Sequence, residues 1–248
     1  MRTVLALLLA LFCIVPASAQ WGAQGFGRPG FNNSKVASTT PPTLSAVSNF
    51  VLGGSGSTRT SATVNIGNPA YIATRRVILA CSTNAMANGP ISSGTINGIT
   101  ANIDLDYEPA NADAVHIFSA VVTSGTTNVT VTLNFPGTQF SNDACEVYNV
   151  DNSLLNSTTA NTGTGTSAST TSLATSSIST SAGGFIVAAG AIGASSTSYA
   201  FTGLTTDAFG GTNTNVISSQ GSLAGGNLTP TATQGTAQTS SVGAAAWR

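Results

Sequence analysis

Apolar and polar residues alternate in short runs along most of the chain, beginning near residue 46. Val64 and Ile66 fall on one side of the run 60–66, and Val129 opens a similar alternation in 126–135. A period of two residues is typical of a β-strand with one buried face. No stretch shows a helical apolar stripe with capping residues. The pattern therefore predicts strands joined by turns.

Two continuous apolar runs, 77–80 and 185–189, interrupt this alternation. Runs of this kind suit central strands covered on both faces, or strands at a subunit contact. We expect strands at 47–52, 59–66, 74–82, 95–103, 114–122, 126–134, 143–150, 168–180, 184–192, 198–205, 213–219, 229–234 and 238–247. So many short, β-branched strands predict an all-β fold over 46–248: an antiparallel β-sandwich that is jelly-roll-like.

The second part of the chain resembles the first at an offset of about 100 residues. The matching segments are RRVILACS (75–82) with GGFIVAAG (183–190), INGITANI (96–103) with FTGLTTDA (201–208), and VTVTL before CEVYNV with TPTAT before GAAAW. This similarity predicts two halves, 46–155 and 165–248, joined through the Ser/Thr/Gly-rich stretch 156–172. Each half could contribute strands to both sheets of one sandwich.

The first 19 residues have the pattern of an export signal. Arg2 supplies a positive charge, and the apolar segment 3–15 is too short to span a bilayer comfortably. The small residues at 17–19 suit cleavage by a signal peptidase. We therefore expect a mature N-terminus near Gln20 and a secreted, extracellular or cell-surface protein, with the periplasm as an alternative. Residues 20–45, rich in Gly, Pro and Asn, are expected to form a flexible leader.

Charged residues make up only 6% of the chain, and Lys35 is its only lysine. Nucleic-acid binding requires a cationic surface that displaces counterions, so this composition argues against it. No apolar run after the signal approaches the length of a membrane span. Disorder usually pairs low hydrophobicity with high net charge, whereas apolar residues here make up 41% of the chain. The composition predicts a folded domain whose solubility rests on hydroxyl and amide groups.

Two cysteines, Cys81 and Cys145, remain after the signal. In an oxidising compartment an even pair favours a disulfide bond, here closing a loop of about 64 residues. The alternative is a pair of buried free thiols, which behave as small hydrophobic side chains.

Acidic residues concentrate in one segment, which contains Asp104, Asp106, Glu108 and Asp113. In an extended segment the first three project to the same side, where their oxygen atoms could bind calcium. No other cofactor is indicated. The alternative is a solvated acidic loop. Two of these carboxyl groups could also serve a glycosidase, which needs them about 5–9.5 Å apart.

His116, the only histidine, shares a predicted strand face with Ala114 and Phe118, which favours a structural role. A serine hydrolase would need a nucleophile elbow of the G-x-S-x-G type, and the sequence has none. No residue is therefore assigned a catalytic role. Scattered tyrosines could form a sugar-stacking platform, although tyrosines of this kind are usually half-buried packing residues.

Several short motifs resemble those of uncharacterised β-sandwich proteins from bacteria and their phages. They are the Arg-Arg-apolar run 75–79, the strand motif 95–101, the Gly-Gly-apolar-Ala strand 183–189 and the turn motif 202–207. The resemblance covers 46–248 and implies an accessory protein of a virion or cell surface, with no catalytic site. The export signal departs from the phage pattern, because virion proteins are normally assembled in the cytoplasm.

These observations predict a non-enzymatic exported protein with a structural or adhesive surface role, cell-surface or virion-associated. Its charge-poor strands could form homo-oligomers through an apolar face or an edge. The alternative is a secreted carbohydrate-binding module that could use calcium bound by Asp104, Asp106 and Glu108. A glycan hydrolase is third. A glycan or another cell-surface ligand is the expected partner.

Overall fold

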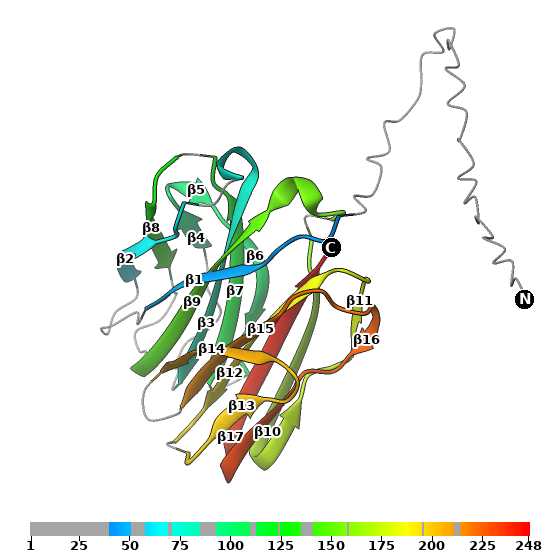
Figure 1. The fold of residues 1–248 in the computed structure, drawn as a ribbon. Helices are drawn as coiled ribbons and strands as arrows, with labels where there is room; N and C mark the ends of the chain where they lie inside the picture. Colours follow the sequence, from blue (N-terminus) through cyan, green and yellow to red (C-terminus); the bar gives the residue numbers. More distant parts are fainter. Residues whose placement is uncertain are drawn as a thin grey trace, which may run out of the picture. The chain divides into compact units, whose positions relative to one another are not determined.

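Antiparallel β-strands form almost all of the regular structure in the computed structural model of the chain (Figure 1). The structure describes residues 40–50, 58–68, 71–84, 93–109, 113–123, 125–134, 141–157, 159–194, 196–210 and 214–248. The expected signal and residues 20–39 of the expected leader lie outside this part. The predicted all-β fold class is confirmed.

The first half of the described chain builds two sheets. Its strands are β1 (Ser45–Phe50), β2 (Thr58–Asn65), β3 (Arg75–Asn84), β4 (Ser93–Ile96), β5 (Ile99–Thr100), β6 (Asn102–Tyr107), β7 (Ala114–Val121), β8 (Asn128–Asn134) and β9 (Ser141–Asp151). Sheet A has the order β1-β9-β3-β7-β6, and sheet B has the order β2-β8-β4-β5. Two short 3-10 helices, η1 (Ile72–Thr74) and η2 (Asn152–Leu154), precede β3 and follow β9.

The second half builds sheet C and a small two-stranded sheet. Its strands are β10 (Asn161–Ala174), β11 (Ile178–Thr180), β12 (Phe185–Ile192), β13 (Tyr199–Phe201), β14 (Thr205–Gly210), β15 (Asn215–Gln220), β16 (Gly226–Leu228) and β17 (Thr231–Trp247). Sheet C has the order β10-β17-β12-β15-β14, with β13 also paired to β17, while β11 pairs with β16. Among the described residues, no strand of one half pairs with a strand of the other.

The same order of strand pairing recurs in both halves. In sheet A, β9 lies between β1 and β3, and β7 and β6 follow; in sheet C, β17 lies between β10 and β12, and β15 and β14 follow. The N-terminal part of β17 pairs with both β10 and β13, as β8 pairs with both β2 and β4. β10 and β17 are thus each equivalent to two strands of the first half. A duplication origin stays a prediction.

Sheets A and C pack face to face through equivalent surfaces. As in an isologous contact, each contact between the two sheets recurs with the roles of the sheets exchanged. β3 contacts β12 at the centre, β6 contacts β10 at one edge, and β1 contacts β14 at the other. In Figure 1 the blue-to-green strands of the first half lie against the yellow-to-red strands of the second. Because β1 is equivalent to β10 and β6 to β14, the two edge contacts are equivalent to each other.

Three apolar clusters hold these layers together. The first lies between sheets A and B and includes Leu79 and Phe118 with Val131. The second lies between sheets A and C and includes Ile78 and Tyr148 with Val187, Ile217 and Trp247. The third covers the other face of sheet C and includes Ile186, Tyr199 and Phe201. Sheets A and C are therefore buried on both faces, as their continuous apolar runs predict, and the molecule is a layered β-sandwich. A jelly-roll-like strand order stays a prediction.

Cys81 and Cys145 form the predicted disulfide bond. The two residues are direct partners on β3 and β9, with 4.1 Å between their Cα atoms. Both side chains are buried in the cluster between sheets A and B. The bond therefore links the two neighbouring central strands of sheet A.

The stretch 156–172 is not simply the connector that its composition suggests, because residues from Asn161 onward belong to β10. Two glycines explain part of this composition. A Cβ at Gly163 would lie 2.7 Å from the side chain of Ile178, and one at Gly165 would lie 3.3 Å from that of Val242 and closer still to the backbone of Ala174. β10 tolerates only glycine at these close approaches, and its remaining hydroxyl-rich surface is largely exposed.

Candidate functional site

An aspartate occupies a β-bulge in each of two edge strands, β6 of sheet A and β14 of sheet C. Along β6 the register with β7 shifts between Ile103 and Leu105, so Asp104 is the extra residue. Along β14 the register with β15 shifts between Thr206 and Ala208, so Asp207 is the extra residue. A bulge re-aims a side chain relative to the strand alternation.

The two bulges occupy equivalent positions in the two halves. Ser119 pairs with Ile78 of the central strand β3, and Ser219 pairs with Val187 of the equivalent strand β12. Asn102 of β6 pairs with Ser119, and Asp104 follows Asn102 by two residues. In the same way, Thr205 of β14 pairs with Ser219, and Asp207 follows Thr205 by two residues. Asp104 and Asp207 therefore correspond.

Asp207 is bound by a side chain from the other half. The Tyr148 hydroxyl donates a hydrogen bond of 2.7 Å to Asp207 Oδ2, and Ser219 forms a side-chain hydrogen bond with Tyr148. Burial and the nearby negative charge of Asp207 raise the pKa of Tyr148 well above its ordinary value. The tyrosine therefore stays a neutral donor, and it closes the seam between the halves on this side.

Asp104 has a different set of neighbours, all from its own half. Burial raises the pKa of its carboxyl group to about 6, opposed by a hydrogen bond with Ser119 and by the positive charge of Arg76. Its Oδ2 atom is shielded from solvent and has no hydrogen-bond partner. A buried acceptor without a donor is costly, so the Asp104 carboxyl group retains an unmet need for a donor.

Arg76 is the cation of this site and is itself only 2% exposed. Its Nη1 donates to Ser119 Oγ at 2.8 Å, and its Nε donates to Asn152 Oδ1 at 2.8 Å. Burial lowers the pKa of Arg76, and the charge of Asp104 opposes that shift. The guanidinium therefore compensates the Asp104 carboxylate within the protein, and the site has little net charge.

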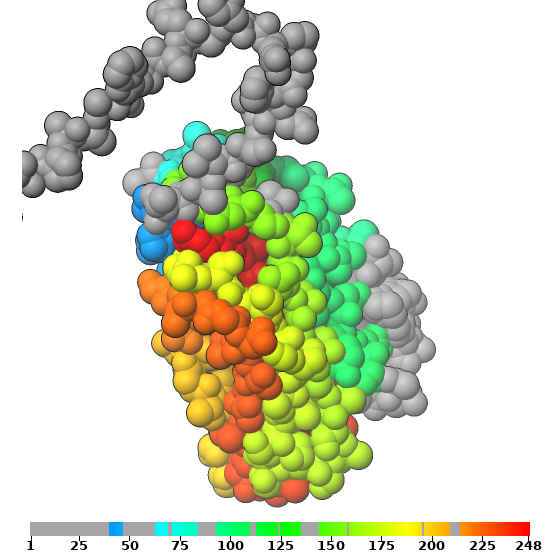
Figure 2. Space-filling model, turned by 90° about the vertical axis from the view of Figure 1, so that its right-hand side faces the viewer, coloured from blue at the N-terminus to red at the C-terminus, as the bar shows by residue number. Residues whose placement is uncertain are grey.

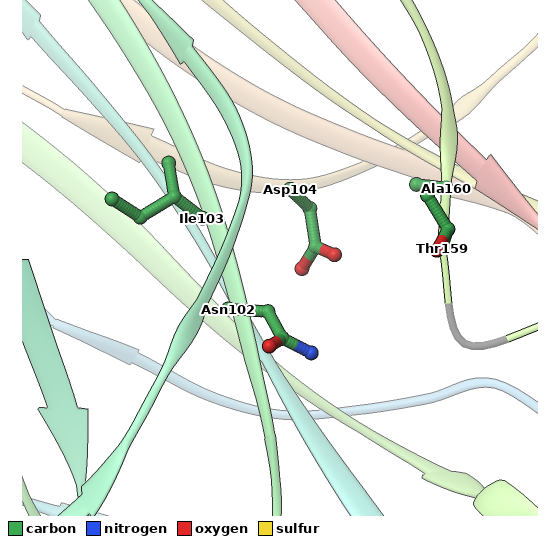
Figure 3. Close-up of a pocket in the computed structure, with 5 residues that line it drawn as sticks. All are labelled: Asn102, Ile103, Asp104, Thr159 and Ala160. Atoms are coloured by element: carbon green, nitrogen blue, oxygen red, sulfur yellow. The ribbon is translucent and has the colours of Figure 1, made fainter.

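A cavity of about 330 Å³ opens in front of Asp104. It is lined by Asn102, Ile103 and Asp104 of β6 and by Thr159 and Ala160, which precede β10. Figure 3 shows the side chains of Asn102 and Asp104 extending toward the Thr159–Ala160 segment, while Ile103 extends away from them. Figure 2 faces the side on which the green surface of the first half meets the yellow-green surface of the second. The cavity lies at the seam between the halves.

The correspondence of the halves suggests why this end of the seam is open. Ala46 of β1 pairs with Tyr148 of β9, and Thr162 of β10 pairs with Ala245 of β17. Because β1 and β9 correspond to β10 and β17, these two pairs are equivalent. Tyr148, the residue that binds Asp207, thus has an alanine as its counterpart. Leu44 lies two residues before Ala46, and Ala160 lies two residues before Thr162. Both Leu44 and Ala160 pack against the cluster between sheets A and C. The second half thus carries the smaller side chain at both positions, and Ala160 lines the cavity together with Asp104.

Asp106 and His116 form a separate pair on the other face of sheet A. His116 Nδ1 donates to Asp106 Oδ1 at 2.7 Å, and the histidine ring stacks on Phe118 with 6.3 Å between ring centroids. His116 is fully buried. The bulge at Asp104 breaks the strand alternation, so Asp104 and Asp106 do not share one side. The expectation of a common side is wrong for these two residues.

The other predicted ligands also lie apart from the cavity lining. Asp113 is buried near Gly193, and Glu108 follows β6 and is half-buried. In the described part of the chain, no group of three or more His, Cys, Asp or Glu side chains is placed to hold a metal ion. Calcium binding by Asp104, Asp106, Glu108 and Asp113 stays a prediction.

Sequence reasoning identified Asp104 but missed its surroundings. Thr159 and Ala160 lie in a hydroxyl-rich stretch with no distinguishing pattern. The position of Arg76 beside an apolar run predicts that it pairs with a carboxylate or flanks a sheet edge, but it does not identify Asp104 as the partner. The similarity of 96–103 to 201–208 was the available signal. It leads directly into the two bulged strands and could have drawn attention to Asp207.

Comparison with protein-family models, with curated proteins and with solved structures finds no match to this chain. Among the described residues, no helix is long and apolar enough to cross a membrane.

Proposed function

We propose that the protein is an exported, non-enzymatic component of a surface, with a structural or adhesive role. The observation that carries this proposal is the packing of two similar sandwiches through one apolar core between sheets A and C. Doubly buried central sheets make a rigid body, which suits a component that bears load or presents a surface. The Cys81–Cys145 bond suits an oxidising compartment.

The placement of the only histidine supports a non-enzymatic role. His116 is fully buried, bonded to Asp106 and stacked on Phe118, so it is poorly placed to exchange protons with a substrate. Asp104 is the single carboxyl group among the described residues that line the cavity. A glycosidase of the usual type needs two carboxyl groups flanking the sugar. The cavity thus supports binding rather than hydrolysis.

Fractionation of a producing culture tests the surface role. Quantitative mass spectrometry across a density gradient would separate free supernatant, envelope and virus-like particles, with a cytoplasmic protein as the control for lysis. The proposal predicts enrichment with envelope or particles. Protein that follows the cytoplasmic control would contradict export, and protein found free in the supernatant would contradict a structural role.

Carbohydrate binding is a second candidate, favoured by the cavity in front of Asp104. Its lining combines a carboxyl group, an amide and a hydroxyl group from Asp104, Asn102 and Thr159. A few convergent polar groups in a concave site are typical of small-molecule recognition. A surface protein with such a site would act as an adhesin for glycans.

A further inference from the structure

We propose that the cavity at the seam between the halves binds one neutral sugar ring, with Asp104 and Asn102 as its main hydrogen-bonding residues. This inference rests on the carbohydrate-binding candidate and names its site. Of the predicted calcium ligands it uses only Asp104, because Asp106 is bonded to His116 on the other face of sheet A.

Asp104 lines the cavity and has unused hydrogen-bonding capacity. Asp104 Oδ2 has no partner in the protein, whereas the equivalent aspartate, Asp207, accepts a hydrogen bond from Tyr148. A sugar hydroxyl can supply the donor that Tyr148 supplies at the other seam. The adjacent Asn102 amide both donates and accepts, which suits a neighbouring hydroxyl of the same ring.

The charges of Asp104 and Arg76 favour a neutral ligand over a cation. Arg76 lies close enough to Asp104 for its charge to act on the carboxyl group, and it is held by Ser119 and Asn152. The carboxylate therefore already has a buried counter-ion. A bound ammonium group would add uncompensated positive charge beside Arg76, and burying such a charge is costly. Hydroxyl groups meet the need for donors without that cost.

The size of the cavity also limits the ligand. The cavity volume of about 330 Å³ lies at the small end of the range for ligand sites. It suits one ring better than an extended chain. Thr159 and Ala160 form the opposite wall, and the small alanine leaves the space that a leucine occupies at the equivalent position, Leu44.

The equivalent seam supplies matched variants for the test. Ala160→Leu fills the cavity with the side chain found at its counterpart, and Leu44→Ala makes the reverse change outside the cavity. Asp104→Asn removes the carboxylate, and Asp207→Asn makes the same change at the corresponding bulge. Asn102→Ala is a milder variant, because Asn102 is exposed and its loss should not affect folding. Thermal unfolding of every variant would establish that it is folded.

Two probes measure binding by the oxidised protein. An array of neutral oligosaccharides identifies recognised glycans, and saturation-transfer NMR with methyl glycosides of the common hexoses tests single rings, with an alkylammonium salt as the cationic comparison. We expect saturable glycan binding that weakens by about tenfold or more in Ala160→Leu, Asp104→Asn and Asn102→Ala. Leu44→Ala and Asp207→Asn should bind as the unmodified protein does.

Each contrary outcome has a separate meaning. Glycan binding that is unchanged in folded Ala160→Leu and Asn102→Ala would overturn this site while leaving carbohydrate binding in place. No binding to any array glycan or methyl glycoside would overturn both the site and the carbohydrate-binding candidate, and would leave the structural surface role unaffected. Binding of the alkylammonium salt alone would overturn the choice of a neutral ligand.

Discussion

The Tyr148 hydroxyl donates a 2.7 Å hydrogen bond to Asp207 Oδ2 and so connects the first half of the chain to the second. Tyr148 is fully buried within the apolar cluster between sheets A and C. The bond therefore lies at the edge of the core that unites the molecule, and it makes this seam different from the open seam at Asp104.

Replacing Tyr148 with phenylalanine should destabilise the protein, because it leaves Asp207 without its donor from the other half. We expect a loss of about 1–3 kcal/mol in the free energy of unfolding, measured by urea titration at neutral pH. Tyr199→Phe is the matched control, since the Tyr199 hydroxyl is buried and has no hydrogen-bond partner. Equal losses in the two variants would contradict the importance of the Tyr148–Asp207 bond.

Asp104 should make stability depend on pH in the direction opposite to that of an ordinary ion-paired carboxylate. Burial raises the pKa of Asp104 from 3.8 in the unfolded chain to about 6 in the folded protein. The folded state thus binds the proton more tightly, so the stabilisation is present below about pH 4 and is lost as pH rises through about 6.

The test is to compare the unmodified protein with Asp104→Asn at about pH 4.5 and about pH 7.5. Relative to the variant, the unmodified protein should gain about 2 kcal/mol of stability at the lower pH. Asp151→Asn is a control that should show almost no change between these pH values. Burial acts to raise the pKa of Asp151, but hydrogen bonds from Thr74 and Ser153 lower it overall, so its stabilisation is lost only at lower pH. If the two proteins differed in stability by the same amount at both pH values, the buried position of Asp104 would be contradicted.

Loss of the Cys81–Cys145 disulfide should destabilise the domain through the unfolded state. The bond closes a loop of 64 residues, for which the chain-entropy relation gives about 4 kcal/mol. Urea unfolding of Cys81→Ala/Cys145→Ala, compared with the oxidised protein, measures this quantity. Stability that is the same in both proteins would show that the bond does not constrain the unfolded chain.

Gly243 should be sensitive to the smallest enlargement, because side chains of sheet A approach it closely. A Cβ at this position would lie 2.7 Å from Val115 Cγ2 and closer still to Leu105 Cδ2. Gly243→Ala should therefore cost about 1–3 kcal/mol by overpacking. Gly221→Ala is the control, since a Cβ there meets nothing within 4 Å. An equal shift of the thermal unfolding temperature in the two variants would contradict the close packing of the halves.

The strand pattern was predictable wherever burial on one or both faces leaves a trace in the sequence. The alternation at Val129 and Val131 corresponds to β8, and the run 77–80 lies within the doubly buried β3. β10 was largely hidden, because it is an exposed edge strand whose hydroxyl residues have no apolar period. A single-residue bulge such as that at Asp104 likewise leaves no periodic signal, so the side to which a carboxylate points could not be predicted.

The site depends on contacts that sequence spacing does not encode. Asp104 meets Arg76 and Ser119 through strand pairing, and the Thr159–Ala160 wall reaches the cavity from the other half. Only the internal similarity carried information about this arrangement. It indicates two related halves, but it matches Asn102 rather than Asp104 with Asp207. The open cavity arises from a difference between the halves, alanine at 160 against leucine at 44.

The intact mass of the protein recovered from a producing culture, with free thiols alkylated before any reduction, tests the proposed export and oxidation together. The account predicts the mass of a chain that begins near Gln20, carries no alkyl group and lacks the two hydrogen atoms lost in the Cys81–Cys145 bond. A chain that retains residues 1–19 and is alkylated at both Cys81 and Cys145 would contradict an exported surface protein.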